Sequence, residues 1–168
     1  FRAHAKLQIG GCILLANLSF APNLRECISD EGGVESLLEA MRHYRADEKI
    51  QLACCQGLYN LAMQADGAES MVDSGGILDI LLAMRNLPNE QLVHRFCCFT
   101  LTELVLCKEH DLKTPMLDEE LQTVNTVQAT YSRFYDHEDV KQAADSLLTL
   151  LGEDMEQTVF TYEEKQRR

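Results

Sequence analysis

The chain has little of several features that mark large protein classes. It lacks tryptophan, holds only three prolines among 168 residues, and has no apolar run near the roughly 20 residues that cross a bilayer. Basic residues are also scarce: 15 against 27 acidic residues give a net charge of -12, which repels phosphate backbones and anionic lipids. We therefore expect no nucleic-acid partner and no direct membrane insertion. The composition, 46% hydrophobic and 25% charged, is typical of a globular protein.

The first residues show no signal-peptide pattern, so we expect a cytoplasmic protein, with the nucleus as the alternative compartment. The chain does not begin with methionine, and its first helical pattern starts in mid-helix. These two features lead us to expect a fragment of a longer protein.

Motifs for metal binding and catalysis are also missing. The seven cysteines are odd in number and form no CxxC unit, which favours reduced thiols. Neighbouring residues such as Cys54-Cys55 and Cys97-Cys98 point about 100° apart on a helix, so these four thiols cannot converge on one metal ion. No HExxH or GxxxxGK pattern occurs. We expect no metal, no cofactor and no catalysed reaction; a redox or metal role for the cysteines remains the alternative.

The sequence repeats with a period of 43 residues. Asn17-Leu18 recurs as Asn60-Leu61, Glu103-Leu104 and Ser146-Leu147, and Gly32-Gly33 recurs as Gly75-Gly76. Apolar residues are spaced three or four apart and strand-like alternation is absent, so each unit is predicted to hold three helices. The predicted domain covers 1–151 and a charged tail covers 152–168. Within the domain we predict the last helix of a truncated repeat at 3–20 and two full repeats at 23–63 and 66–107. A degenerate capping repeat follows at 110–151.

These units resemble armadillo repeats. The resemblance is carried by strings such as Gly33-Val-Glu-Ser-Leu-Leu and Gly76-Ile-Leu-Asp-Ile-Leu-Leu, each followed by a third helix with the Asn-Leu or Glu-Leu pair. HEAT repeats have a similar period but two helices per unit, and the Gly-Gly corner favours armadillo. The resemblance implies an all-α fold: a right-handed superhelix of about three three-helix repeats.

The third helices are expected to divide into two faces. Two apolar ladders at equivalent positions are predicted to face the core: Leu15, Leu58, Leu101 and Ala144, and Leu18, Leu61, Leu104 and Leu147. The opposite stripe is expected to line a concave groove. In armadillo proteins the third-helix Asn binds the backbone of an extended peptide, and Asn17 and Asn60 match that position, whereas Glu103 and Ser146 do not. The chain lacks the Trp of importin-type proteins, which disfavours a receptor for nuclear-localisation signals.

A scaffold or adaptor that binds a partner protein or peptide in this groove is the predicted function. The expected partner-binding residues are Asn17, Phe20, Gln56, Tyr59, Asn60, Met63, Arg95, Phe99 and Glu103. A simpler interpretation makes the helical asparagines satisfied side chains on a solvated face, and Phe96 and Phe99 core residues. The alternative function is a structural or self-associating module that uses its ends and a predicted helix over 118–134. The sequence leaves the oligomeric state open.

Overall fold

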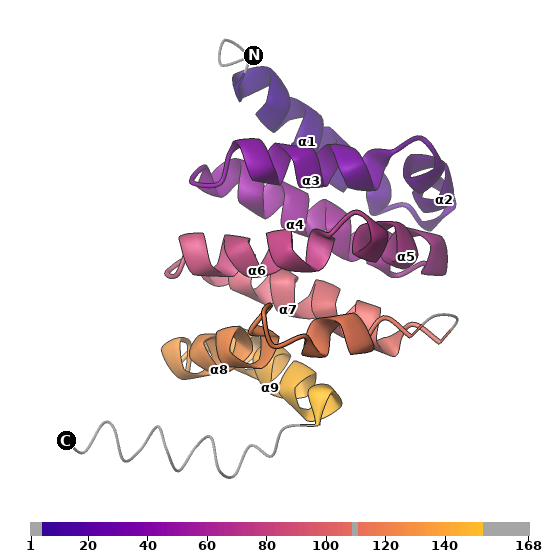
Figure 1. The fold of residues 1–168 in the computed structure, drawn as a ribbon. Helices are drawn as coiled ribbons and strands as arrows, with labels where there is room; N and C mark the ends of the chain where they lie inside the picture. Colours follow the sequence, from indigo (N-terminus) through magenta and orange to yellow (C-terminus); the bar gives the residue numbers. More distant parts are fainter. Residues whose placement is uncertain (1–4, 109–110, 153–168) are drawn as a thin grey trace, which may run out of the picture.

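The computed structural model describes residues 5–108 and 111–152, and every regular element in these two ranges is helical (Figure 1). The α-helices are α1 (Ala5–Ser19), α2 (Pro22–Asp30), α3 (Gly33–His43), α4 (Glu48–Ala62), α5 (Ala65–Asp73), α6 (Gly76–Asn86), α7 (Gln91–Leu106), α8 (Thr123–Arg133) and α9 (Glu138–Leu151). A short 3-10 helix, Thr114–Leu117, precedes α8. The all-helical prediction is confirmed for these residues.

The helices stack in successive layers from the N-terminal to the C-terminal end. In Figure 1, α3, α6 and α8 lie one below another, with α4, α7 and α9 behind them and α2 and α5 to one side. The packing follows the same order, because α1 contacts α4, α4 contacts α7, and α7 contacts α9. The starts of α3 and α6, Gly33 and Gly76, are 43 residues apart, as are the starts of α4 and α7, Glu48 and Gln91.

Glycine pairs make the corners at which α3 and α6 begin. Gly32 and Gly75 both have a φ of 75°, which other residues rarely adopt. Gly33 and Gly76 follow them and pack against the preceding helix: a Cβ on Gly76 would lie 2.7 Å from the Met71 carbonyl oxygen. Each pair therefore combines a left-handed turn with a close backbone approach, and this explains why both positions are glycine.

The core follows the predicted ladders over most of its length. The side chains of Leu61, Leu104 and Leu147 are fully buried, as are those of Leu58, Leu101 and Ala144. The prediction was wrong at the N-terminal end, where Leu18 is 39% exposed and Leu15 is only half-buried. In α4 the equivalent face packs against the preceding helix α3, whereas among the described residues no helix precedes α1.

The last helices also depart from the prediction. The helix expected over 118–134 is shorter, because α8 starts only at Thr123. Before it, the Asp118 carboxylate accepts a hydrogen bond from the Glu120 N–H at 2.9 Å, and Gln122 has a φ of 51°. This turn replaces the first helical turn that the sequence pattern predicted. Except for Gly152, the predicted tail lies outside the described residues, as do residues 3, 4 and 110 of the predicted units.

Candidate functional site

The predicted site residues lie on α1, α4 and α7 and at the ends of these helices. Asn17 and Phe20 are exposed, Phe20 by 77%, and Met63 is 41% exposed just beyond α4. Gln56 and Tyr59 on α4 are half-buried, as are Arg95, Phe99 and Glu103 on α7. Because α4 packs on α7, the structure brings the residues of these two helices together.

Three aromatic rings form the centre of this surface, and we call them the aromatic cluster: Tyr59, Phe96 and Phe99. The Tyr59 ring centroid lies 5.5 Å from that of Phe99 and 6.1 Å from that of Phe96, and the two phenylalanines meet edge to face at 6.3 Å. These separations are typical of favourable aromatic pairs. Both phenylalanines pack against the core while remaining half-exposed, so they belong to both core and surface.

Arg95 covers part of the aromatic cluster. Its guanidinium carbon lies 5.5 Å from the Phe99 ring centroid and 5.8 Å from that of Phe96, within the range of a cation–π contact. The Arg95 Nη1 atom also donates to the Asp139 carboxylate of α9 at 3.0 Å. Its Nε atom is buried without a hydrogen-bond partner among the described residues. This ion pair joins α7 to α9 within the chain, through a residue that the sequence pattern did not single out.

The two candidate asparagines lie in different surroundings. Asn17 is exposed, whereas Asn60 is 8% exposed and its Nδ2 atom donates to the Ala16 carbonyl at 3.3 Å and to Ser19 Oγ at 3.1 Å. Both N–H groups of the Asn60 amide are therefore used to join α4 to α1. This geometry corrects the expected peptide clamp, because Asn60 has no amide N–H left to offer a ligand.

Glu103 occupies the position equivalent to Asn60, one period later. It is half-buried, and loss of solvation raises the pKa of its carboxyl group. Burial and the Glu103 charge together raise the pKa of the Tyr59 hydroxyl. A partly desolvated carboxylate beside aromatic rings is suited to an incoming cation, which would restore the lost stabilisation of its charge.

Arg25, from α2, also belongs to this surface and was missed by the sequence analysis. Its Nε atom donates to the Ser19 carbonyl at 2.8 Å, and its Nη1 atom lies 3.2 Å from the Met63 sulfur. Arg25 thus fixes the chain after α1 and places Met63 beside it. No pattern signalled this role, because the contact joins residues 38 positions apart in sequence.

The four cysteines of the two adjacent pairs behave as buried apolar residues, whereas Cys27 is exposed and Cys107 is half-buried. Cys54, Cys55, Cys97 and Cys98 are at most 1% exposed, and the Cys55 and Cys97 sulfurs lie 3.5 Å apart as free thiols. Burial raises the pKa of the Cys98 thiol to about 12, so it stays protonated and unreactive near neutral pH. Within residues 5–108 and 111–152, no group of three or more His, Cys, Asp or Glu side chains could hold a metal ion.

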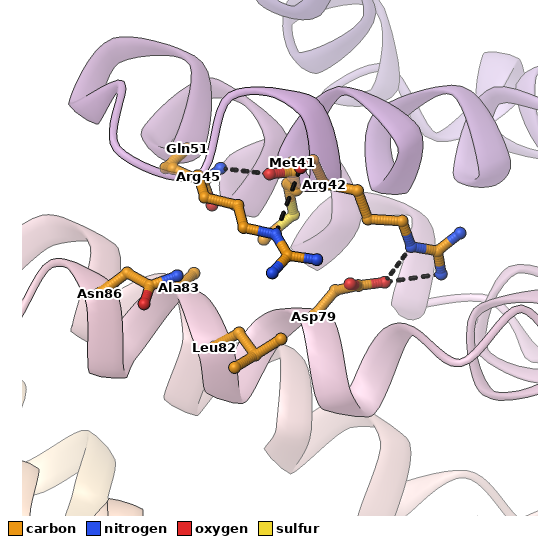
Figure 2. Close-up of a pocket in the computed structure, with 8 residues that line it drawn as sticks. All are labelled: Met41, Arg42, Arg45, Gln51, Asp79, Leu82, Ala83 and Asn86. Atoms are coloured by element: carbon orange, nitrogen blue, oxygen red, sulfur yellow. Dashed lines mark hydrogen bonds and ion pairs between the residues drawn. The ribbon is translucent and has the colours of Figure 1, made fainter.

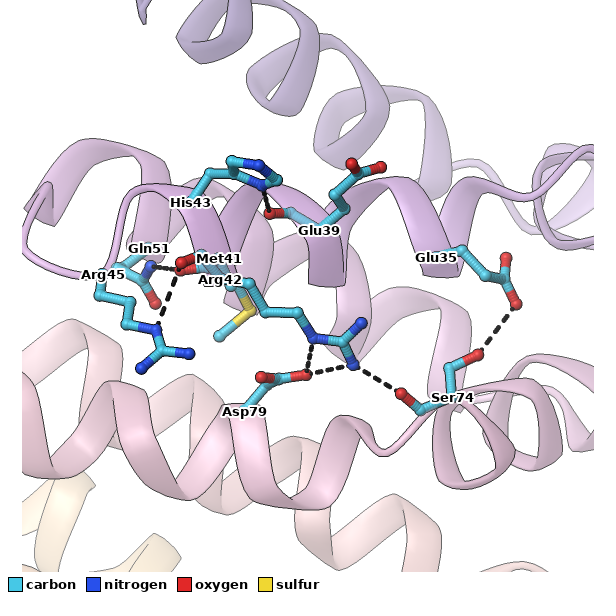
Figure 3. A network of polar contacts seen from close by, with 9 residues as sticks. All are labelled: Glu35, Glu39, Met41, Arg42, His43, Arg45, Gln51, Ser74 and Asp79. Atoms are coloured by element: carbon cyan, nitrogen blue, oxygen red, sulfur yellow. Dashed lines mark hydrogen bonds and ion pairs between the residues drawn. The ribbon is translucent and has the colours of Figure 1, made fainter. Parts of the chain in front are cut away.

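A separate polar junction connects α3 to α6 and includes Gln51 of α4 (Figures 2 and 3). Arg42 donates through Nε to the Asp79 carboxylate at 2.8 Å and through Nη2 to the Ser74 carbonyl at 2.6 Å. Gln51, 1% exposed, donates to the Met41 carbonyl at 2.9 Å and to the Tyr44 carbonyl at 3.0 Å. The junction encloses a cavity of only about 10 Å³, so it is filled by its own side chains.

The fold and these surfaces define the class of the protein as an all-α protein of stacked helices. None of the described helices is both long and apolar enough to cross a membrane. Comparisons with protein-family models, curated proteins and solved structures found no match.

Proposed function

We propose that this chain is an armadillo-like solenoid that binds another protein on the face formed by α1, α4 and α7. The observation that carries this proposal is the aromatic cluster, which remains half-exposed on adjacent helices. Phe20 and Met63 extend the apolar surface toward α1, and Leu106, 51% exposed, extends it along α7. Aromatic and methionine side chains in such patches commonly carry the binding energy of interfaces.

The proposed partner presents an apolar anchor and a basic group. The anchor would pack against the aromatic cluster, and the basic group would face the Glu103 carboxylate. The net charge of -12 favours a basic partner through long-range attraction. Asn17, Gln56 and Tyr59 would supply hydrogen bonds at the edge, whereas Asn60 holds α4 to α1. No catalysed reaction forms part of this proposal.

Affinity capture from cell lysate with two matched variants tests the proposal. Phe20→Ala with Met63→Ala removes two exposed apolar side chains from the proposed face, and Leu78→Ala with Leu92→Ala removes two exposed apolar side chains elsewhere, at 44% and 45%. We expect the first variant to lose a discrete set of proteins that the second variant retains. Equal capture by both variants would contradict the proposal. Circular dichroism confirms that both variants fold.

The exposed apolar row on α1 favours a second candidate, self-association through this end of the stack. Leu7, Leu14 and Leu18 are 72%, 58% and 39% exposed, whereas Ile50 and Leu61, at positions equivalent to Leu7 and Leu18, are fully buried. A Leu14→Glu, Leu18→Glu variant would separate a dimer if this row forms its interface. Sedimentation of the wild type and the variant checks this candidate. An identical mass for both would contradict it.

A further inference from the structure

A cavity of about 290 Å³ lies between α6 and α8. Its polar lining consists of Arg85, Gln122, Asn125, Thr126, Thr130 and Arg133, together with the buried His94. None of its lining residues is acidic, although the chain has 27 acidic residues and only 15 lysines and arginines. Two arginines therefore line a cavity whose lining holds no carboxylate, on a protein whose overall charge is strongly negative.

This cavity is the equivalent, one period later, of the junction between α3 and α6. Arg85 is 43 positions after Arg42, and Gln122 is 43 positions after Asp79. In the first junction the Asp79 carboxylate fills the space beside Arg42 (Figure 2). In the second, the residue equivalent to Asp79 in sequence is the neutral Gln122, directly before α8, and the cavity is about 290 Å³ rather than about 10 Å³.

The guanidinium of Arg85 is held in place by neutral acceptors. Its Nε and Nη2 atoms donate to Thr126 Oγ1 at 3.0 Å and 2.8 Å, and Nη2 also donates to the Leu121 carbonyl. Arg133 donates through Nη1 to Asn89 Oδ1 at 3.0 Å. The ion pairs Arg42–Asp79 and Arg95–Asp139 within the described part of the chain involve neither Arg85 nor Arg133.

We propose that the cavity between α6 and α8 binds an oxyanion, a carboxylate or a phosphate group, in the place that the Asp79 carboxylate takes beside Arg42. Arginine suits this ligand, because its planar guanidinium donates to two oxygens at once. The side-chain amide of Asn125, which also lines the cavity, supplies a further donor, whereas the Thr126 hydroxyl already donates to the Gln122 carbonyl. Gln122 lines the cavity and directly precedes α8, so the N-terminal end of that helix lies at the cavity. The helix dipole also favours an anion at this end.

Calorimetric titration of the full chain tests this site, with inorganic phosphate in one arm and succinate in the other, at constant ionic strength and without chloride. We expect saturable binding in at least one arm. Phosphate binding alone would identify a phosphate site, and succinate binding alone a carboxylate site. Arg85→Gln and Arg133→Gln should each weaken binding about tenfold, because each removes a charged donor. Arg42→Gln is the matched control and should bind as the wild type does.

A second pair of variants tests the position of the ligand. Gln122→Asp would supply the carboxylate that the first junction already has, so it should abolish binding by pairing with Arg85. Gln122→Asn adds no charge, tolerates the left-handed conformation and should keep binding. The absence of saturable binding in both arms, an unchanged affinity in Arg85→Gln, or equal binding by the two Gln122 variants would overturn the proposal. Thermal denaturation verifies that each variant is folded.

Discussion

The junctions between α3 and α6 and between α6 and α8 use equivalent positions and reach different results. In the first, the Arg42–Asp79 ion pair links α3 to α6, the Gln51 amide of α4 binds the end of α3, and almost no space remains. In the second, Gln122 and His94 occupy the positions of Asp79 and Gln51, and a cavity opens. The helices therefore pack on one another with or without this ion pair, and where the carboxylate is missing the arginine donates to neutral acceptors instead.

His94 and Gln51 perform the same structural task with different sensitivity to pH. The His94 Nε2 atom lies 3.2 Å from the Leu87 carbonyl, 43 positions after the Tyr44 carbonyl that Gln51 binds. The hydroxyl of Thr130 lies 2.7 Å from Nδ1, and the ring packs on Phe134 with centroids 4.9 Å apart. Burial lowers the pKa of His94 to about 4, so the imidazole is neutral at pH 7.

The largest expected effect is a loss of stability in acid, caused by His94 at the junction between α6 and α8. Between about pH 6.5 and about pH 4, His94 is protonated in the unfolded chain and neutral in the folded protein. This difference in pKa lowers the free energy of unfolding by about 3 kcal/mol as the pH falls through that range. His94→Gln should remove this part of the pH dependence, and Gln51→His should add a similar one to the first junction. Urea denaturation at several pH values checks both. Equal slopes for wild type and His94→Gln would refute the assignment.

The next effect in size concerns how α6 and α8 begin. Gly76→Ala should lower the free energy of unfolding by about 2 kcal/mol, because the new Cβ would lie 2.7 Å from the Cγ and the carbonyl oxygen of Met71. Glu119, the equivalent position before α8, is exposed, so Glu119→Ala should change stability by less than about 0.5 kcal/mol. Chemical denaturation of the two variants measures the contrast. Similar losses of stability in both variants would contradict the claim that the close backbone contact at Gly76 makes glycine necessary there.

The smallest effect is that of the ion pair itself. Asp79→Gln makes the first junction resemble the second, and we expect it to cost about 1 kcal/mol, since the Arg42 side chain is 42% exposed and its pairing is screened by water. Denaturation of Asp79→Gln, Arg42→Gln and the double variant gives the coupling energy of the pair. A coupling energy near zero would mean that packing, rather than charge, closes this junction.

The sequence predicted the helices and the buried ladders well where one repeat resembles another. Leu61 and Leu104 follow the helical period, and burial of that face requires no knowledge of distant contacts. The late start of α8 was not predictable from periodicity. The apolar spacing is helical from residue 118 onward, but the turn at Asp118 and the left-handed Gln122 delay the first turn of the helix. The predicted burial of Leu18 was wrong, because the exposure of a side chain depends on which helix packs beside it.

The candidate site was predicted less completely than the fold. Helical spacing placed Tyr59 and Phe99 on facing helices, and the structure brings their rings together. The Arg95–Asp139 pair and the amide of Asn60 depend on how one layer stacks on the next, across 44 residues in each case. Such contacts carry no local signal, so the residues that form them could be identified only once the layers were positioned.

The layered packing of α1 on α4, α4 on α7 and α7 on α9 also shapes how the protein opens. Each layer is supported mainly by its immediate neighbours, so local unfolding should begin at the edges of the stack and spread inward. α1, which leaves Leu7 and Leu14 in water, should lose its hydrogen-exchange protection first. The amides of α4 and α7, supported from both sides, should exchange last and report the stability of the whole domain.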